Sequence, residues 1–220
     1  MSFGEAISEG ASVEKLLLHL NGNANDSSGN GFNGTATNVT YSLAAGKLNE
    51  GAAFTTATSK ISIADNAALR FTNNFTVSFL FFTTNTDSSQ HCYVSKSRVV
   101  AGNYTGWVIN KYASQQIGFV IFKGAMALDD LYIPTSNLLG KWNLIHCIKD
   151  SNVMKIYLNG EFKVSRYCGT MVASTDPLII GNSTTIYGFA DANIDEVRIR
   201  TRVLTQQEIQ KEYTNALGRF

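Results

Sequence analysis

Residues Phe75–Phe82 read Phe-Thr-Val-Ser-Phe-Leu-Phe-Phe, in which every second residue from Phe75 to Phe81 is apolar. Successive side chains of a β-strand point to opposite faces, so this alternation predicts a strand with one face in a hydrophobic core. The run Leu80-Phe81-Phe82 is apolar on both faces. A strand of this kind favours a sandwich of two packed sheets over a barrel.

Residues 154–164 predict a β-hairpin. Two extended segments, Met154–Leu158 and Glu161–Val164, flank the dipeptide Asn159-Gly160. Asn-Gly between alternating segments favours a two-residue turn in which both residues have positive φ. The two segments are therefore expected to pair as antiparallel neighbours.

Short strand patterns separated by turn residues continue along most of the chain. They lie at 15–20, 39–41, 52–55, 60–63, 92–96, 106–110, 117–122, 142–148, 177–180 and 194–200, and one helical turn is expected at 65–69. Many short strands with little helix predict an all-β fold of two antiparallel sheets.

The same alternation predicts the core. Its expected members are Leu18, Phe54, Phe75, Val77, Phe79, Trp107, Trp142, Ile156, Leu158, Val197 and Ile199. The cysteines Cys92, Cys147 and Cys168 are odd in number and widely spaced, which favours buried reduced thiols over a disulfide or a metal site.

One short C-terminal helix is predicted from Thr205 to about Asn215. Thr205 and Glu208 form a capping-box pattern, in which each side chain binds the backbone amide of the other residue. Leu204 and Ile209 are spaced to pack together across the start of this helix.

The composition excludes several classes of protein. Hydrophobic residues make up 44% of the 220 residues, charged residues only 16%, and the net charge is +1. The chain has no basic stripe for nucleic acid and no apolar run of about 18 residues for membrane insertion. A polar surface of Ser, Thr, Asn and Gly suits sugars or close packing in an assembly.

The chain divides into a flexible N-terminal arm, residues 1–14, and one sandwich domain, residues 15–220. Residues Met1–Ser12 have neither a basic region nor an apolar stretch, so we expect synthesis in the cytoplasm without a signal peptide. The arm is polar and unpatterned, and it is expected to order only against a partner, as a tether to an assembly.

The order of motifs from Leu16 to Tyr213 resembles the concanavalin A-like lectin/glucanase superfamily in its laminin G-like jelly-roll branch. The matching pieces are Leu18-His19-Leu20-Asn21-Gly22-Asn23, 26–35, 46–54, 75–79, Lys141-Trp142-Asn143, 156–160, 194–199, Leu204 and Glu208-Ile209. The resemblance implies an all-β, two-sheet antiparallel jelly-roll sandwich. It does not imply one function, because this fold carries lectins, glycosidases, peptide binders and structural modules.

The residues argue against an enzyme. Glycosidases of this superfamily use carboxylates on alternate residues of one strand, whereas this chain has the adjacent pairs Asp129-Asp130 and Asp195-Glu196. Adjacent carboxylates on a strand point to opposite faces and cannot share one glycosidic bond. The histidines His19, His91 and His146 all lie in or beside strand patterns and are interpreted as structural.

The resemblance also implies a structural calcium ion, held between the loop after the first strand and the Asp of the penultimate strand motif. The candidate ligands are Asp26, Asn30 and Asp195, with Asn21 as a weaker fourth. Calcium prefers about 6 to 8 oxygen ligands, which such side chains and loop carbonyls can supply. The alternative is equally weighted: Asp26 opens an Asx turn and Asp195 accepts backbone amides.

Loop aromatics are the candidate ligand-binding residues. Tyr104 and Tyr187 are flanked by small polar residues, as a shallow sugar site requires, and Tyr112 and Phe189 are further candidates. The alternative is that these rings merely cover the edge of the sandwich.

We therefore expect a non-catalytic carbohydrate-binding or adhesive module. By analogy with phage decoration, fibre and tail proteins, it would be displayed on a virion surface and bind a glycan or cell-surface polysaccharide. The alternative is a structural virion decoration or cement protein with no glycan ligand. A divergent hydrolase is a third hypothesis.

Overall fold

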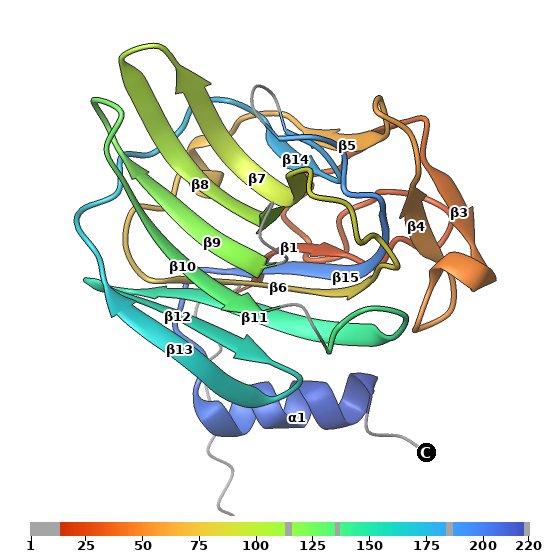
Figure 1. The fold of residues 1–220 in the computed structure, drawn as a ribbon. Helices are drawn as coiled ribbons and strands as arrows, with labels where there is room; N and C mark the ends of the chain where they lie inside the picture. The colour runs from red at the N-terminus through yellow and green to blue at the C-terminus, as the bar shows by residue number, and fades with distance from the viewer. Residues whose placement is uncertain (1–13, 113–115, 135–136, 184–186, 218–220) are drawn as a thin grey trace, which may run out of the picture.

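The computed structural model describes residues 14–112, 116–134, 137–183 and 187–217. These residues form two antiparallel sheets that face each other (Figure 1). The eight-stranded sheet has the order β13-β12-β11-β6-β15-β4-β3, with β1 also paired to β15, and the seven-stranded sheet has the order β10-β9-β8-β7-β14-β5-β2. The predicted jelly-roll sandwich is confirmed.

The strands of the eight-stranded sheet are β1 (Glu14–Leu18), β3 (Thr40–Ser42), β4 (Gly51–Phe54), β6 (Phe75–Phe82), β11 (Trp142–Asp150), β12 (Val153–Leu158), β13 (Glu161–Tyr167) and β15 (Ala192–Arg200). Those of the seven-stranded sheet are β2 (Thr35–Thr37), β5 (Lys60–Ile63), β7 (His91–Val100), β8 (Asn103–Tyr112), β9 (Gln116–Lys123), β10 (Leu128–Pro134) and β14 (Leu178–Ile180). Two short 3-10 helices, Leu43–Ala45 and Ala67–Leu69, and the helix α1 (Gln206–Ala216) complete the described elements. Within them, no helix is long and apolar enough to cross a membrane.

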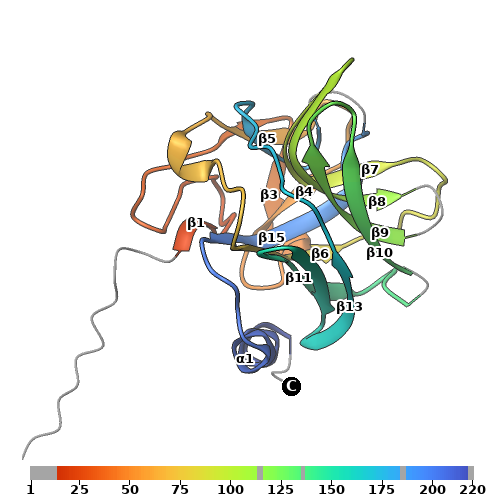
Figure 2. The same cartoon turned by 90° about the vertical axis from the view of Figure 1, so that its left-hand side faces the viewer.

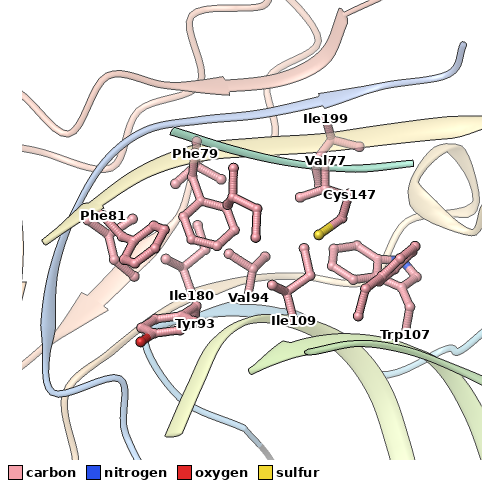
Figure 3. Packing of buried hydrophobic residues seen from close by; sticks show 14 of the residues in the cluster. Val77, Phe79, Phe81, Tyr93, Val94, Trp107, Ile109, Cys147, Ile180 and Ile199 are labelled. Carbon is pink, nitrogen blue, oxygen red and sulfur yellow. The ribbon is translucent and has the colours of Figure 1, made fainter. Parts of the chain in front are cut away.

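The core lies between the two sheets. Val77, Phe79 and Phe81 of β6 point from one sheet toward Val94 and Trp107 of the other, as Figure 3 shows. The rings of Phe79 and Phe81 are 6.0 Å apart. The apolar residues at every second position of β6 are therefore the ones on its inward face, which is fully buried between the two sheets.

The opposite face of β6 is also covered, which explains its apolar residues on both sides. Leu80 packs in a small cluster with Leu144 and Leu217, beneath the end of α1. Figure 1 and Figure 2 show α1 on the outer side of the eight-stranded sheet, away from β7, β8 and β9. The helix therefore does not contribute to the outer face of the seven-stranded sheet.

The placement of Trp142 in the core was wrong. Trp142 is only partly buried, and its ring lies 5.9 Å from that of Phe82, outside the main core. The register of β11 explains the difference: Ile145 and Cys147 point inward, so the even-numbered Trp142 and Leu144 point outward. The other predicted core residues all belong to the main cluster.

The two strongest local predictions are confirmed. Asn159 and Gly160 have φ of 53° and 80°, and they join β12 to β13 as a hairpin. The Thr205 side chain accepts a hydrogen bond from the Glu208 amide and the Glu208 carboxylate accepts one from the Thr205 amide, so the capping box is formed at the start of α1. Leu204 and Ile209 share one buried cluster.

The structure corrects the boundaries at two places. Glu14, assigned to the arm, belongs to β1 and pairs with Arg200 of β15, while residues 1–13 lie outside the described residues. The strands β2 and β10 had no predicted counterpart. The cysteines Cys92, Cys147 and Cys168 are free and buried, as predicted.

Candidate functional site

Strand register arranges the outer face of the seven-stranded sheet in rows. Cys92, Asn110, Gly118 and Tyr132 are opposite one another on β7, β8, β9 and β10. Directly opposite residues of an antiparallel sheet place their side chains on the same face. Chain neighbours such as Ile109 point into the main core. This row therefore faces outward, away from the other sheet.

Tyr104 and Tyr187 lie on this same outer face. Both pack against a small buried cluster that is separate from the main core and consists of Cys92, Val99, Val108, Val120 and Phe122. The Tyr104 ring meets Phe122 edge-on, with centroids 5.6 Å apart. Two tyrosines from distant parts of the sequence thus share one apolar floor.

Tyr112 and Tyr132 complete the group, since their ring centroids are 5.4 Å apart. Burial raises the pKa of the Tyr187 phenol, and nearby Cys92, Tyr112 and Tyr104 add to the rise. Burial also raises the pKa of Tyr132, as do the neighbouring groups that include Tyr112 and Tyr187. We call the surface formed by Tyr104, Tyr112, Tyr132 and Tyr187 the tyrosine face.

One carboxylate borders the tyrosine face. Asp130 precedes Tyr132 by two residues on β10, so both side chains are on the same face of the strand. Its carboxylate accepts a hydrogen bond from the Arg166 guanidinium of β13 at 2.6 Å. The face therefore offers phenol groups and one paired acid, with little net charge.

The segment that follows β13 is hydrogen-bonded to β8 and β9 close to Tyr104. The Val172 amide donates a hydrogen bond to the Phe122 carbonyl at 3.0 Å, and the Val172 carbonyl accepts one from Gly106 at 2.7 Å. The Tyr112 end of the face is more open, because 37% of the Tyr112 surface is exposed. A ligand approaching the tyrosine face would therefore meet the Tyr112 end first.

Three of the four predicted ligand-binding aromatics, Tyr104, Tyr112 and Tyr187, come together in this way. The fourth, Phe189, packs edge-on against His91 with centroids 6.0 Å apart, and its carbonyl accepts a hydrogen bond from that histidine. Phe189 is not among the residues packed on the apolar floor beneath Tyr104 and Tyr187.

Sequence reasoning missed Tyr132 and Asn110 as site residues. Tyr132 lies between the inward-pointing Leu131 and Ile133, so the alternation Leu-Tyr-Ile was the signal that could have placed its ring outward. Asn110 had no comparable signal. Only the pairing of its strand with β7 and β9 places its side chain beneath the tyrosines.

The loop that holds Asp26 is tied together by hydrogen bonds. The Asp26 carboxylate accepts from the amides of Leu17, Ser28 and Phe32 at 2.9 to 3.1 Å, and from the Ser28 hydroxyl. These bonds lower its pKa although burial opposes them. The Asn30 amide donates to the carbonyls of Glu14 and Lys15. The bond from the Ser28 amide to the Asp26 carboxylate is the contact that the Asx-turn alternative expects.

Asp195 lies elsewhere and has a different set of partners. Its Oδ2 accepts hydrogen bonds from the amides of Lys47 and Leu48 at 2.9 and 2.8 Å, while its Oδ1 is buried without a partner among the described residues. Asn21 is exposed. The described residues contain no group of three or more His, Cys, Asp or Glu placed to bind a metal. Calcium binding at these positions stays a prediction.

The groups considered for catalysis are engaged in structural contacts. Asp129 accepts from Lys123 at 3.0 Å, whereas the adjacent Asp130 pairs with Arg166. The three histidines each contact an acid: His19 contacts Glu196, His91 contacts Asp87, and His146 contacts Glu212.

A cavity of about 130 Å³ lies between α1 and the eight-stranded sheet. Its walls include Leu80, Leu144, Glu196 and Glu212, and its described lining contains no aromatic residue. The two acids are paired, Glu196 with Arg198 and Glu212 with Arg200. The tyrosine face is therefore the better candidate for a site that recognises a sugar.

The architecture and the aromatic outer face define a lectin-like β-sandwich. A sequence model of the concanavalin A-like lectin/glucanases superfamily, of the laminin G type, matches residues 54–210, and the chain belongs to this superfamily. A search of curated proteins by sequence finds no match.

Solved structures with this fold include three toxin domains. The binding domain of Paraclostridial Mosquitocidal Protein 1 is 17% identical, with a TM-score of 0.69, and the match covers 87% of this chain and 49% of that one. The botulinum neurotoxin serotype G binding domain is 19% identical, with a TM-score of 0.70 and coverage of 92% and 50%. The receptor binding domain of botulinum neurotoxin D is 17% identical, with a TM-score of 0.71 and coverage of 93% and 53%. The chain thus spans about half the length of these structures.

Proposed function

We propose that this protein is a non-catalytic carbohydrate-binding module whose ligand contacts the tyrosine face. The observation that carries the proposal is the convergence of four tyrosines on the outer face of one sheet, over an apolar floor. Sugars place their C–H faces on aromatic rings, and their hydroxyl groups bind polar groups beside those rings. The tyrosine face offers both kinds of contact.

The low charge of the face suits a neutral ligand. A shallow site of this kind provides only a few kcal/mol of binding free energy, so we expect a dissociation constant of about 0.1 to 1 mM for each site. Several copies on one particle would raise the overall affinity, because every binding event after the first becomes intramolecular.

Two findings support a binding role. The carboxylates and histidines that an enzyme would use are held in structural contacts. The similar solved structures are binding domains of other proteins. We propose that this chain is likewise a binding module, with a glycan as its ligand.

The test is a binding screen against immobilised glycans, followed by a matched pair of variants. Tyr112→Ala removes a ring that is 37% exposed on the tyrosine face. Phe162→Ala removes a ring that is 49% exposed on the outer face of the other sheet, opposite Tyr157. We expect Tyr112→Ala to weaken binding about tenfold, as the loss of one stacked ring of about 1.4 kcal/mol implies, and Phe162→Ala to have no effect.

Two results would contradict the proposal. Equal losses in both variants would place the ligand away from the tyrosine face. Release of sugar from any polysaccharide would restore the hydrolase hypothesis.

We also propose that the module is displayed on a virion and attached through its N-terminal arm. Deleting residues 1–13 should abolish incorporation into the particle and leave the melting temperature unchanged, because β1 begins at Glu14. If incorporation depends on the arm but no glycan binds, the protein is a decoration or cement subunit instead.

A further inference from the structure

Asn110 occupies the middle of the row beneath the tyrosines. It lies on β8, opposite Cys92 of β7 and Gly118 of β9. Gly118 is in turn opposite Tyr132 of the edge strand β10. Because the row faces outward, the Asn110 amide is on the side of the sheet where a ligand would bind.

The Asn110 amide is fully buried and has no hydrogen-bond partner in the described part of the chain. Its exposed fraction is 0%, and neither Nδ2 nor Oδ1 has a partner among the described residues. Burying an amide without hydrogen-bond partners destabilises the folded state by the full desolvation free energy of its polar groups. A leucine side chain of similar size has no polar group to desolvate. An unpaired group of this sort in a folded protein therefore calls for an explanation other than stability.

A tyrosine ring lies on the other side of Gly118 from this amide. A Cβ atom on Gly118 would lie 2.4 Å from Cε1 of Tyr132 and 3.0 Å from Oδ1 of Asn110, so the ring fills the space that the glycine leaves free. Tyr132 is only partly buried and belongs to an edge strand. Rotation of its side chain would open the space above Gly118, next to the amide, without any change in the sheet.

The uncovered space has two chemical features. The amide presents an N–H donor and a carbonyl acceptor, and either one can form a single hydrogen bond with a trans amide, to its carbonyl or from its N–H. The floor beside it is apolar, since Val108 and Val120 lie in the next row and Cys92 in the same row. An acetamido group has this combination, because its amide can pair with Asn110 while its methyl group packs on the floor.

We propose that Asn110 is the recognition residue of a subsite for the acetamido group of an N-acetylated sugar, with Tyr132 as its cover. The inference rests on the proposed function and adds the class of sugar to it. The two tyrosines nearest the row, Tyr112 and Tyr187, would contact the sugar ring.

The probes are polymer conjugates of N-acetylglucosamine and N-acetylgalactosamine, compared with conjugates of glucose and galactose. Each pair differs only in the acetamido or hydroxyl group at one carbon. We expect the protein to prefer at least one acetylated sugar about tenfold, which corresponds to a gain of about 1.4 kcal/mol.

Asn110→Leu tests the residue itself. We expect this variant to melt at a higher temperature than the unchanged protein and to lose the acetamido preference. Asn143→Leu is the matched control: Asn143 is also fully buried, but its Nδ2 donates to the carbonyls of Leu138 and Lys141. This control should melt at a lower temperature, because it leaves those carbonyls without a donor.

Gly118→Ala is a second variant, in case Asn110→Leu fails to fold. Its new methyl group would occupy the subsite at the Tyr132 ring, so the acetamido preference should fall while Asn110 stays in place.

The outcomes separate the two proposals. Binding that depends on Tyr112 but shows no acetamido preference, or an unchanged preference in a folded Asn110→Leu variant, overturns the subsite and leaves the proposed function standing. Lower stability of Asn110→Leu also overturns it, because Asn110 would then be a structural residue. Absence of binding to every sugar overturns both.

Discussion

Replacing Asp195 by asparagine should change how the stability of the protein depends on pH. Asp195 is completely buried in β15, and burial raises its pKa from 3.8 to about 6, although the amides of Leu48 and Lys47 oppose the rise. A rise of about two pKa units corresponds to about 3 kcal/mol between the two protonation states. Because the folded pKa is the higher one, the folded protein holds this proton more tightly than the unfolded chain.

The sign of the effect follows from this difference. The stabilising contribution of the proton on Asp195 is fully present below the unfolded pKa of about 3.8 and is lost as the pH rises through about 6. We compare the two proteins by the difference between their free energies of unfolding, unchanged protein minus Asp195→Asn. This difference should increase by up to about 3 kcal/mol when the pH is lowered from 7 to 4. Groups that titrate identically in both proteins cancel in this comparison.

The assay is urea denaturation of both proteins at closely spaced pH values, with a chelator present so that calcium cannot contribute. A constant difference between pH 7 and pH 4 would refute the reasoning. A difference that decreases toward pH 4 would show that Asp195 has a lowered pKa and stabilises the fold as an ordinary hydrogen-bonded carboxylate.

Three further predictions concern other parts of the molecule. If calcium binds, a calcium concentration of about 100 times the dissociation constant adds about 2.7 kcal/mol to the free energy of unfolding. Chelation should then lower the melting temperature by several degrees, and calcium but not magnesium should restore it. Identical melting curves with and without chelator, together with an unaffected Asp26→Ala variant, would exclude the site. Phe79→Ala should cost about 3 to 5 kcal/mol in urea denaturation, since Phe79 is completely buried, and a cost below about 1 kcal/mol would contradict its place in the core. Thr205→Ala removes the cap of α1 and should cost about 1 kcal/mol, whereas Thr205→Ser should cost little; equal losses would show that the hydroxyl does not cap the helix.

The sequence alone was sufficient for the features that depend on neighbouring residues. The alternation in Phe75–Phe82, the Asn159-Gly160 turn and the Thr205–Glu208 capping box are interactions over a few positions, and each is formed as predicted. Their order along the chain also indicated the superfamily. Such elements can be predicted because their interacting residues are close together in the sequence. They stay close whatever the arrangement of the rest of the protein.

The tyrosine face depended on the tertiary structure. Tyr187 follows β14, which pairs with β7, and this pairing carries its loop to the floor beneath Tyr104. Asn110 and Tyr132 are placed by the registers of β8, β9 and β10, and a shift of one residue would turn both side chains to the opposite face. Registers between strands are set by the packing of the whole sandwich. The sequence could therefore nominate Tyr104, Tyr112 and Tyr187 one by one, but only the folded sheet shows that they form one surface above an unpaired amide.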